Sequence, residues 1–147
     1  SLDFRIQFEG VTASSLKLTK VVKITYGNTG VDVTVSPAAS GSYHTGTITG
    51  LAAGTYTFSV KGPAHTLKSF TATIPTSGIQ DWTDPALPAG DITNDNYIDD
   101  ADYSALVADF DPGVQKTSNA DLNFDGYVNI SDYSFLVKNY NPGVPGQ

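Results

Sequence analysis

The stretch DLNFDGYVNISD, residues 121–132, places oxygen-bearing groups at regular intervals along 12 residues. Calcium takes six to eight oxygen ligands, and 12-residue loops supply them from positions 1, 3, 5, 7, 9 and 12, with a glycine at position 6 for the sharp turn. Gly126 occupies position 6. The segment therefore predicts a calcium-binding loop, with these ligands: Asp121, Asn123, Asp125, the Tyr127 carbonyl, Asn129 (directly or through water) and Asp132.

The same pattern occurs 30 residues earlier in the chain. Residues 91–114 and 121–144 are identical at 11 of 24 positions at this offset. In the first loop Asn96 takes the turn position, which is acceptable because asparagine tolerates a positive φ. Two loops in register favour two Ca²⁺ ions over a merely solvated acidic surface. The ligands predicted for the first loop are Asp91, Thr93, Asp95, the Tyr97 carbonyl, Asp99 and Asp102.

Both loops depart from the usual EF-hand pattern at position 12. Asp102 and Asp132 stand there instead of glutamate, and the shorter side chain should draw the following helix closer to the ion. Thr93 at position 3 is a weaker ligand, for which the fourth carboxylate of the first loop compensates. At position 8, Ile98 and Val128 are expected to pair the two loops and to enter the core.

An apolar, periodic segment follows each loop. It predicts short helices over residues 101–109 and 131–139, each ended by a Pro-Gly pair. Residues 89–147 are therefore expected to form a small α-helical calcium-binding module. The loop 121–132 together with the YSFLV that follows it resembles a dockerin repeat, and the duplicated arrangement is similar to a type I-like dockerin with two F-hand units.

The resemblance to dockerins implies a function for this module. It implies two bound Ca²⁺ ions, each held by an F-hand, which is an EF-hand-like loop followed by one helix. It also implies that the helices grip a cohesin-like β-sandwich partner. Residues at loop positions 10 and 11 would recognise that partner, namely Asp100, Ala101, Ile130 and Ser131.

Residues 1–75 alternate between apolar and polar side chains with the period of β-strands. Turn-forming residues separate the runs, and roughly seven short strands indicate a mostly β sandwich, Ig-like or transthyretin-like. The stretch TGTITGLAAGTYTFSVKGP, residues 45–63, resembles the end of a transthyretin-like or carboxypeptidase-regulatory-like sandwich. That resemblance implies a fold more than a function.

Residues 76–88 are predicted to be a proline-rich linker between the two domains. The stretch contains Trp82, the only tryptophan. Two interpretations remain open for this side chain. It packs between the two domains, or it anchors a protein partner, since tryptophan is enriched among interface hot spots.

The charge is divided between the two halves of the chain. Residues 1–78 carry six basic and three acidic side chains, a net charge of +3, whereas residues 79–147 carry two basic and twelve acidic ones, a net charge of −10. This asymmetry supports a domain boundary and argues against nucleic acid as a ligand of the acidic half. The chain opens at Ser1 with no apolar segment, which predicts a mature secreted or cell-surface product with no membrane span.

The sequence predicts no enzyme. It contains no nucleophile with a base and an orienting group, and the aspartates available for a glycosidase pair are assigned to metal. His44 and His65 are expected to be surface or packing residues. Carbohydrate stacking on Tyr26, Tyr43 and Tyr56 is a minor alternative.

Two functional hypotheses follow. The first is a secreted, non-catalytic calcium-binding protein of extracellular assembly or adhesion. It would act as a filament subunit that associates with its own copies, through head-to-tail contacts or through strand addition by Leu2–Phe8. The second is a dockerin adaptor that docks onto a separate cohesin-like scaffold protein of a polysaccharide-degrading complex.

Overall fold

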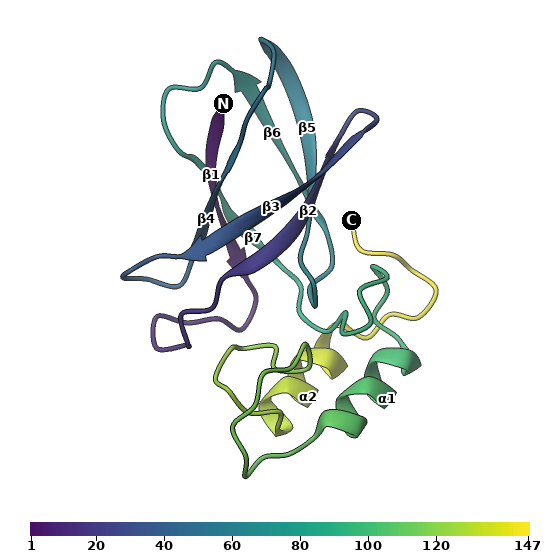
Figure 1. Cartoon of the computed structure of the whole chain (residues 1–147). Helices are drawn as coiled ribbons and strands as arrows, with labels where there is room; N and C mark the ends of the chain where they lie inside the picture. The colour runs from purple at the N-terminus through teal and green to yellow at the C-terminus, as the bar shows by residue number, and fades with distance from the viewer.

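The computed structural model describes all 147 residues and shows a chain that is mostly β with two short helices (Figure 1). The strand-rich N-terminal part expected from the alternation is confirmed. The helices expected after the loops are confirmed within one residue. The elements are β1 (Leu2–Phe8), β2 (Lys20–Tyr26), β3 (Thr29–Pro37), β4 (His44–Ile48), β5 (Gly54–Lys61), β6 (Lys68–Ile74), β7 (Gln80–Leu87), α1 (Asp100–Asp109) and α2 (Ile130–Asn139).

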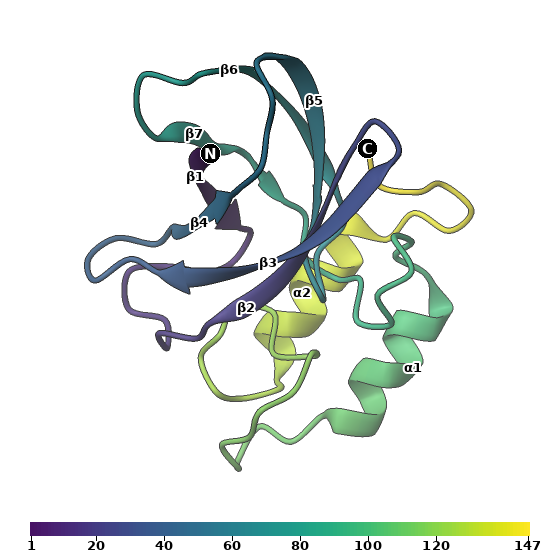
Figure 2. The same cartoon turned by 45° about the horizontal axis from the view of Figure 1, so that its top comes forward.

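The seven strands form one sheet in the order β6-β5-β2-β3-β4-β1-β7. Neighbouring strands are antiparallel except β1 and β7, which are parallel. β3 and β4 share only the pairs Ser36–Thr45 and Pro37–His44, and then diverge, so the sheet folds over into two layers (Figure 2). The two ends of the sheet meet where Phe70 of β6 stacks on Trp82 of β7, with ring centroids 5.3 Å apart.

The core of the sandwich is built from the apolar face of each strand. In β1 the alternation buries Leu2, Phe4, Ile6 and Phe8 completely. Trp82 belongs to this core, because it is only 4% exposed and stacks on Phe4 as well as on Phe70. Both interpretations offered for Trp82 are therefore wrong. The side chain fills the sandwich interior and has no free face for a partner.

The stretch expected to be a linker holds a strand of the sheet. β7 pairs with β1 in parallel, from Phe4 beside Gln80 to Phe8 beside Leu87. β1 consequently has hydrogen-bonded neighbours on both sides, β4 and β7. The expectation that Leu2–Phe8 is free for strand addition is therefore wrong. Alternation reveals which face of a strand is buried, but not whether the strand lies at an edge.

The loop–helix unit, residues 89–147, packs against one end of the sandwich (Figure 1). Phe124 of the second loop is 3% exposed and lies in the sandwich core, 5.5 Å from the Phe8 ring. Its backbone carbonyl accepts a hydrogen bond from the Leu16 amide at 2.8 Å. On the other side Glu9 accepts hydrogen bonds from Lys138 Nζ at 2.7 Å and Asn139 Nδ2 at 2.6 Å. The two parts therefore share side chains and bury them together.

Phe124→Ala should destabilise the sandwich as well as the loop. Truncating a buried phenylalanine costs about 3–5 kcal/mol of unfolding free energy through lost contacts and a residual cavity. Urea denaturation in calcium, followed by Trp82 fluorescence for the sandwich and by circular dichroism for the helices, should show this loss in both signals. Phe110→Ala is the matched control, since Phe110 is exposed. Equal stabilities of the two variants would contradict the shared core.

Candidate functional site

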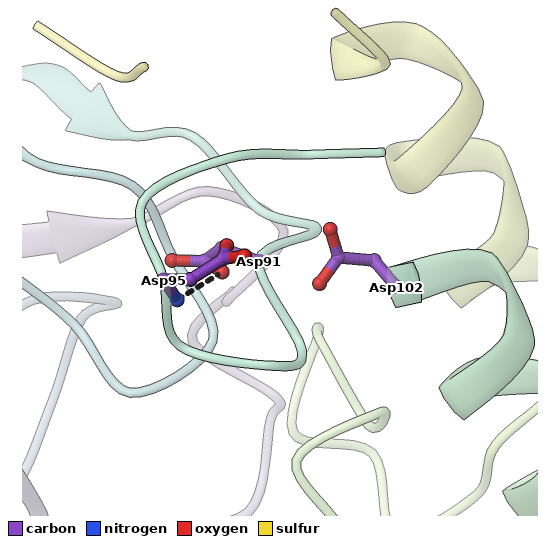
Figure 3. A group of neighbouring side chains, drawn as sticks. All are labelled: Asp91, Asp95 and Asp102. Atoms are coloured by element: carbon purple, nitrogen blue, oxygen red, sulfur yellow. Dashed lines mark hydrogen bonds between the residues drawn. The ribbon is translucent and has the colours of Figure 1, made fainter. Parts of the chain in front are cut away.

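The two loops bring together the carboxylates expected at positions 1, 5 and 12. Within each cluster, one carboxylate oxygen from every residue lies within 4.8 Å of the others. Figure 3 shows the first cluster, in which Asp102 at the start of α1 faces Asp91 and Asp95 across the loop. The two clusters are Asp91, Asp95 and Asp102 in the first loop and Asp121, Asp125 and Asp132 in the second.

The carboxylate at position 1 is fixed by backbone amides of its own loop. Asp91 Oδ1 accepts a hydrogen bond from the Asp95 amide at 3.0 Å, and Oδ2 accepts one from the Asn96 amide at 2.9 Å. In the second loop Asp121 accepts the equivalent bonds from the amides of Asp125, at 3.1 Å, and Gly126, at 2.8 Å. The repeated sequence therefore folds twice into the same loop.

The turn geometry of the loops agrees with the sequence. The φ angles at position 6 are 66° for Asn96 and 88° for Gly126, in the region that glycine and asparagine tolerate. Position 4 is also left-handed, with φ of 62° at Asn94 and 58° at Phe124. This second left-handed residue was not expected. In the second loop it directs the Phe124 ring into the sandwich core.

The last residues of each loop also begin the helix. Asp99 at position 9 caps α1 and accepts a hydrogen bond from the Ala101 amide at 3.1 Å, while Asp102 Oδ2 accepts one from the Asp99 amide at 2.9 Å. Asn129 and Asp132 form the same reciprocal capping box at the start of α2. The carboxylate at position 12, Asp102 or Asp132, thus belongs both to the loop and to the capping box of the helix. Disturbing the loop should therefore disturb the helix.

The other predicted ligands do not belong to the two carboxylate clusters, and their role as ligands stays a prediction. The hydroxyl of Thr93 donates a hydrogen bond to Asp102 Oδ1 at 3.0 Å, so it lies beside the cluster. The amide side chain of Asn123 donates to Asp125 Oδ2 at 3.3 Å. The further predicted ligands are Asp99, Asn129 and the carbonyls of Tyr97 and Tyr127.

Burial makes these clusters costly without a cation. Removal from water, together with the neighbouring charge of Asp132, raises the pKa of Asp121 to about 6. Burial likewise raises the pKa of Asp102 and of Asp132. A raised pKa means that the folded loop disfavours the charged carboxylate, and a bound divalent cation would reverse that preference. Oxygen donors alone, at this spacing, suit a hard cation such as Ca²⁺.

A lysine of the sandwich reaches the first loop. Lys61, the last residue of β5, places its Nζ 2.6 Å from Asp91 Oδ2 and donates a hydrogen bond to Asn94 Oδ1 at 2.8 Å. The second loop contains no ion pair; Lys20 Nζ instead lies 4.7 Å from the centroid of the Phe124 ring. No motif marks Lys61 in the sequence, because its contact depends on how the two parts pack.

The hydrophobic residues at position 8 behave only partly as expected. Ile98 and Val128 are both buried, as predicted. They do not pair with each other, and that expectation is wrong. The Ile98 carbonyl accepts a hydrogen bond from the Asn141 amide and the Val128 carbonyl accepts one from the Asp111 amide, each at 2.9 Å. Each loop is therefore tied to the segment that follows the other helix.

The residues predicted to recognise a partner lie at the surface. Asp100, Ala101, Ile130 and Ser131 are exposed at the starts of the two helices, and Ile130 is 65% exposed. A groove of about 320 Å³ lies between α1 and α2, and Tyr140 donates a hydrogen bond to Asp100 at its rim. The groove is lined by Asp100, Tyr103, Tyr133, Leu136, Val137 and Tyr140.

The remaining candidates are occupied in packing. His44 and His65 are buried beside Phe8, which confirms that they are packing residues. Tyr26 and Tyr56 pack edge to face, with ring centroids 5.8 Å apart. No helix has the length and the apolar character needed to cross a membrane.

Comparison with known proteins gives similarity of structure alone. No family model and no curated protein matches the chain. Among the solved structures that resemble it are two interface mutants of a type II cohesin–X-dockerin complex from Acetivibrio cellulolyticus. For the C-terminal interface mutant the TM-score is 0.62 at 19% identity, and for the N-terminal interface mutant it is 0.61 at 22% identity. Each match covers 96% of this chain and 96% of the other. At these identities the likeness establishes a shared fold.

This comparison corrects the family assignment made from the sequence. The likeness runs through the sandwich and the loop–helix unit together, whereas the sequence was divided into a transthyretin-like sandwich and a dockerin. The only helices are two segments of ten residues, which give no support to a separate dockerin at the C-terminus. The assignment of a dockerin at the C-terminus behind a transthyretin-like sandwich is therefore withdrawn.

The stability of the fold should fall in mild acid through His65. Burial lowers the pKa of His65 to about 4, whereas its ordinary value is 6.5. Between these values the unfolded chain binds the extra proton, so stability is full above pH 6.5 and is lost as the pH falls towards 4. The loss attributable to His65 is about 2–3 kcal/mol.

Urea denaturation of the wild type and of His65→Gln, both in excess calcium, measures this loss. The wild type should lose more stability than the variant between pH 6.5 and pH 4, because carboxylate titration is common to both. Parallel pH profiles would show that His65 is not the group responsible.

Proposed function

We propose that this chain is a non-catalytic module of an extracellular protein assembly and that it binds a protein partner. The observation that carries the proposal is the likeness to type II cohesin–X-dockerin complexes over 96% of the chain. Those proteins form a two-component complex, and this chain acts as one component of a comparable complex. The cohesin-like partner expected from the sequence rested on the dockerin assignment and is dropped with it.

In this proposal each loop holds one structural Ca²⁺. Support comes from the three converging carboxylates of each loop and from the burial of Asp91, Asp102 and Asp132, which leaves them without water. Extracellular calcium-binding modules have dissociation constants of about 10⁻⁴–10⁻³ M, so such sites stay filled outside the cell. The ions then act as parts of the fold and not as signals, because metal binding supplies folding free energy.

The outer faces of the two helices are the surface proposed for the partner. They present large apolar side chains to solvent, and a concentrated apolar patch with a polar rim is typical of protein interfaces. The patch is continuous with the groove between α1 and α2. Its exposed apolar residues are Tyr103, Val107, Phe110, Ile130, Val137 and Tyr140.

Association between copies of the chain is the second candidate. The sandwich of one copy, residues 1–88, and the acidic loop–helix unit of the next, residues 89–147, have opposite net charge, +1 against −8. Two Ca²⁺ ions would reduce the second value to −4, which still leaves an attraction. A head-to-tail contact of this kind produces open filaments unless it closes into a ring. Light scattering separates the candidates, since only self-association gives large particles that dissolve in salt.

Calcium removal should abolish the helices. Isothermal titration calorimetry of chelator-treated protein should detect two Ca²⁺ ions per chain, and circular dichroism should show helix gained during the titration. Asp121→Asn should remove one of the two binding events, because it replaces the negatively charged ligand at position 1 of the second loop with a neutral amide. Asp32→Asn is the control, since Asp32 lies on β3 outside both loops. A wild type that binds no calcium would refute the metal assignment.

The partner face can be tested with each component of the Acetivibrio cellulolyticus complex, purified separately. Surface plasmon resonance should detect binding of this chain to one component, weakened at least tenfold by Ile130→Asp, since a buried unpaired charge is costly at an interface. Val21→Asp is the matched control, because Val21 is exposed on β2. Failure to bind either component, or equal effects of the two variants, would contradict the proposed face.

A further inference from the structure

Lys61 joins the sandwich to the first position of the first loop through a buried ion pair. Its side chain is 13% exposed, that of Asp91 is fully buried, and Nζ lies 2.6 Å from Asp91 Oδ2. Lys61 Nζ also donates hydrogen bonds to the Gly62 carbonyl and to Asn94 Oδ1. Removing both charges from water is favourable only with such close geometry and further hydrogen bonds. The contact is therefore specific and differs from the exposed Lys23–Asp32 pair on the same sheet.

The contact bears directly on how Asp91 is oriented. Asp91 Oδ2 accepts hydrogen bonds from the Asn96 amide and contacts Lys61, while Oδ1 accepts from the Asp95 amide. A carboxylate held on both oxygens cannot rotate freely. Groups that orient a metal ligand from outside the coordination sphere typically change metal affinity by 10–100-fold when they are removed.

The charge inventory of the two loops points to the same role. At the predicted ligand positions the first loop has four carboxylates, Asp91, Asp95, Asp99 and Asp102, and the second has three, because Asn129 replaces Asp99. Only the first loop has an ion-paired lysine. With Lys61 included, the charge of the ligand side chains of the first loop falls from −4 to −3, which equals that of the second set. Lys61 thus offsets the repulsion that the fourth carboxylate introduces.

We propose that Lys61 is a positioning residue of the first calcium loop, so that the sandwich sets the calcium affinity of this loop but not that of the second. Lys61 does not contact the ion. It fixes the carboxylate of Asp91 and compensates the additional charge. The inference rests on the proposed calcium binding and adds a role for the sandwich that the loop sequence does not contain.

Matched reporters for the two loops are present in the full chain. The amides at position 6 donate to the carboxylate at position 1 in both loops, from Asn96 at 2.9 Å and from Gly126 at 2.8 Å. Their NMR signals during a calcium titration report each loop separately. In Lys61→Met the calcium midpoint of Asn96 should rise by about 10–100-fold. The midpoint of Gly126 should change by less than about twofold, because Lys61 pairs with a carboxylate of the first loop only. A change that small lies below the 10–100-fold typical of a lost orienting group.

Two further variants separate the cause from general effects. Lys61→Gln keeps a hydrogen-bond donor without the charge, and its Asn96 midpoint should rise less than in Lys61→Met. Lys23→Met removes the neighbouring lysine, which lies opposite Lys61 in the β2–β5 ladder and whose ion pair is with the exposed Asp32. It should leave both midpoints unchanged.

An unchanged or lowered Asn96 midpoint in Lys61→Met would overturn the inference, because Lys61 would then be irrelevant to calcium or would compete with it. Equal shifts of Asn96 and Gly126 would overturn it as well, since they would indicate general loosening. If neither amide responds to calcium in the wild type, the proposed calcium function fails first and the role of Lys61 fails with it.

Discussion

Buried carboxylates at the first and last positions of two loops are the constraint on which the loop–helix unit depends. Asp91, Asp102, Asp121 and Asp132 are withdrawn from water, and the backbone amides together with the one ion pair to Lys61 do not neutralise four negative charges. The carboxylates at position 12 also complete the capping boxes from which both helices begin. Under the calcium binding that we propose, cation binding, loop closure and helix formation are one event. On that proposal the small core that contains Leu106 and Leu136 depends on the bound cations.

The sandwich takes part in the same event. Phe124 extends from the second loop into the sandwich core, and Lys61 extends from the sandwich into the first loop. Glu9 accepts hydrogen bonds from α2. Within one molecule, a basic residue of the sandwich therefore pairs with an acidic residue of a loop, as Lys61 does with Asp91. The outer faces of α1 and α2 are exposed, whereas their inner residues Leu106 and Leu136 are buried in the small core of the loop–helix unit.

The local sequence pattern predicted which face of a strand is buried and how the loops are built, but not the contacts between segments that are distant in the sequence. The alternation in Leu2–Phe8 identified the buried face of β1, and the loop spacing identified the converging carboxylates. β7 was missed because QDWTDPAL does not alternate, and its position depends on pairing with β1. The role of Lys61 depends on packing across the two parts and leaves no signal nearby. The family assignment failed for a related reason, since a short motif describes an ion site and not the architecture of the whole chain.

Hydrogen exchange of the intact chain, with calcium and with chelator, tests the central claim most directly. If the loops and the sandwich form one calcium-dependent unit, chelation should remove protection from residues 91–139. It should also reduce protection at the end of β1 and at His65, which pack against Phe124. Protection lost in the loops alone, with the sandwich unchanged, would contradict this account. Protection unchanged throughout would show that the buried carboxylates need no cation.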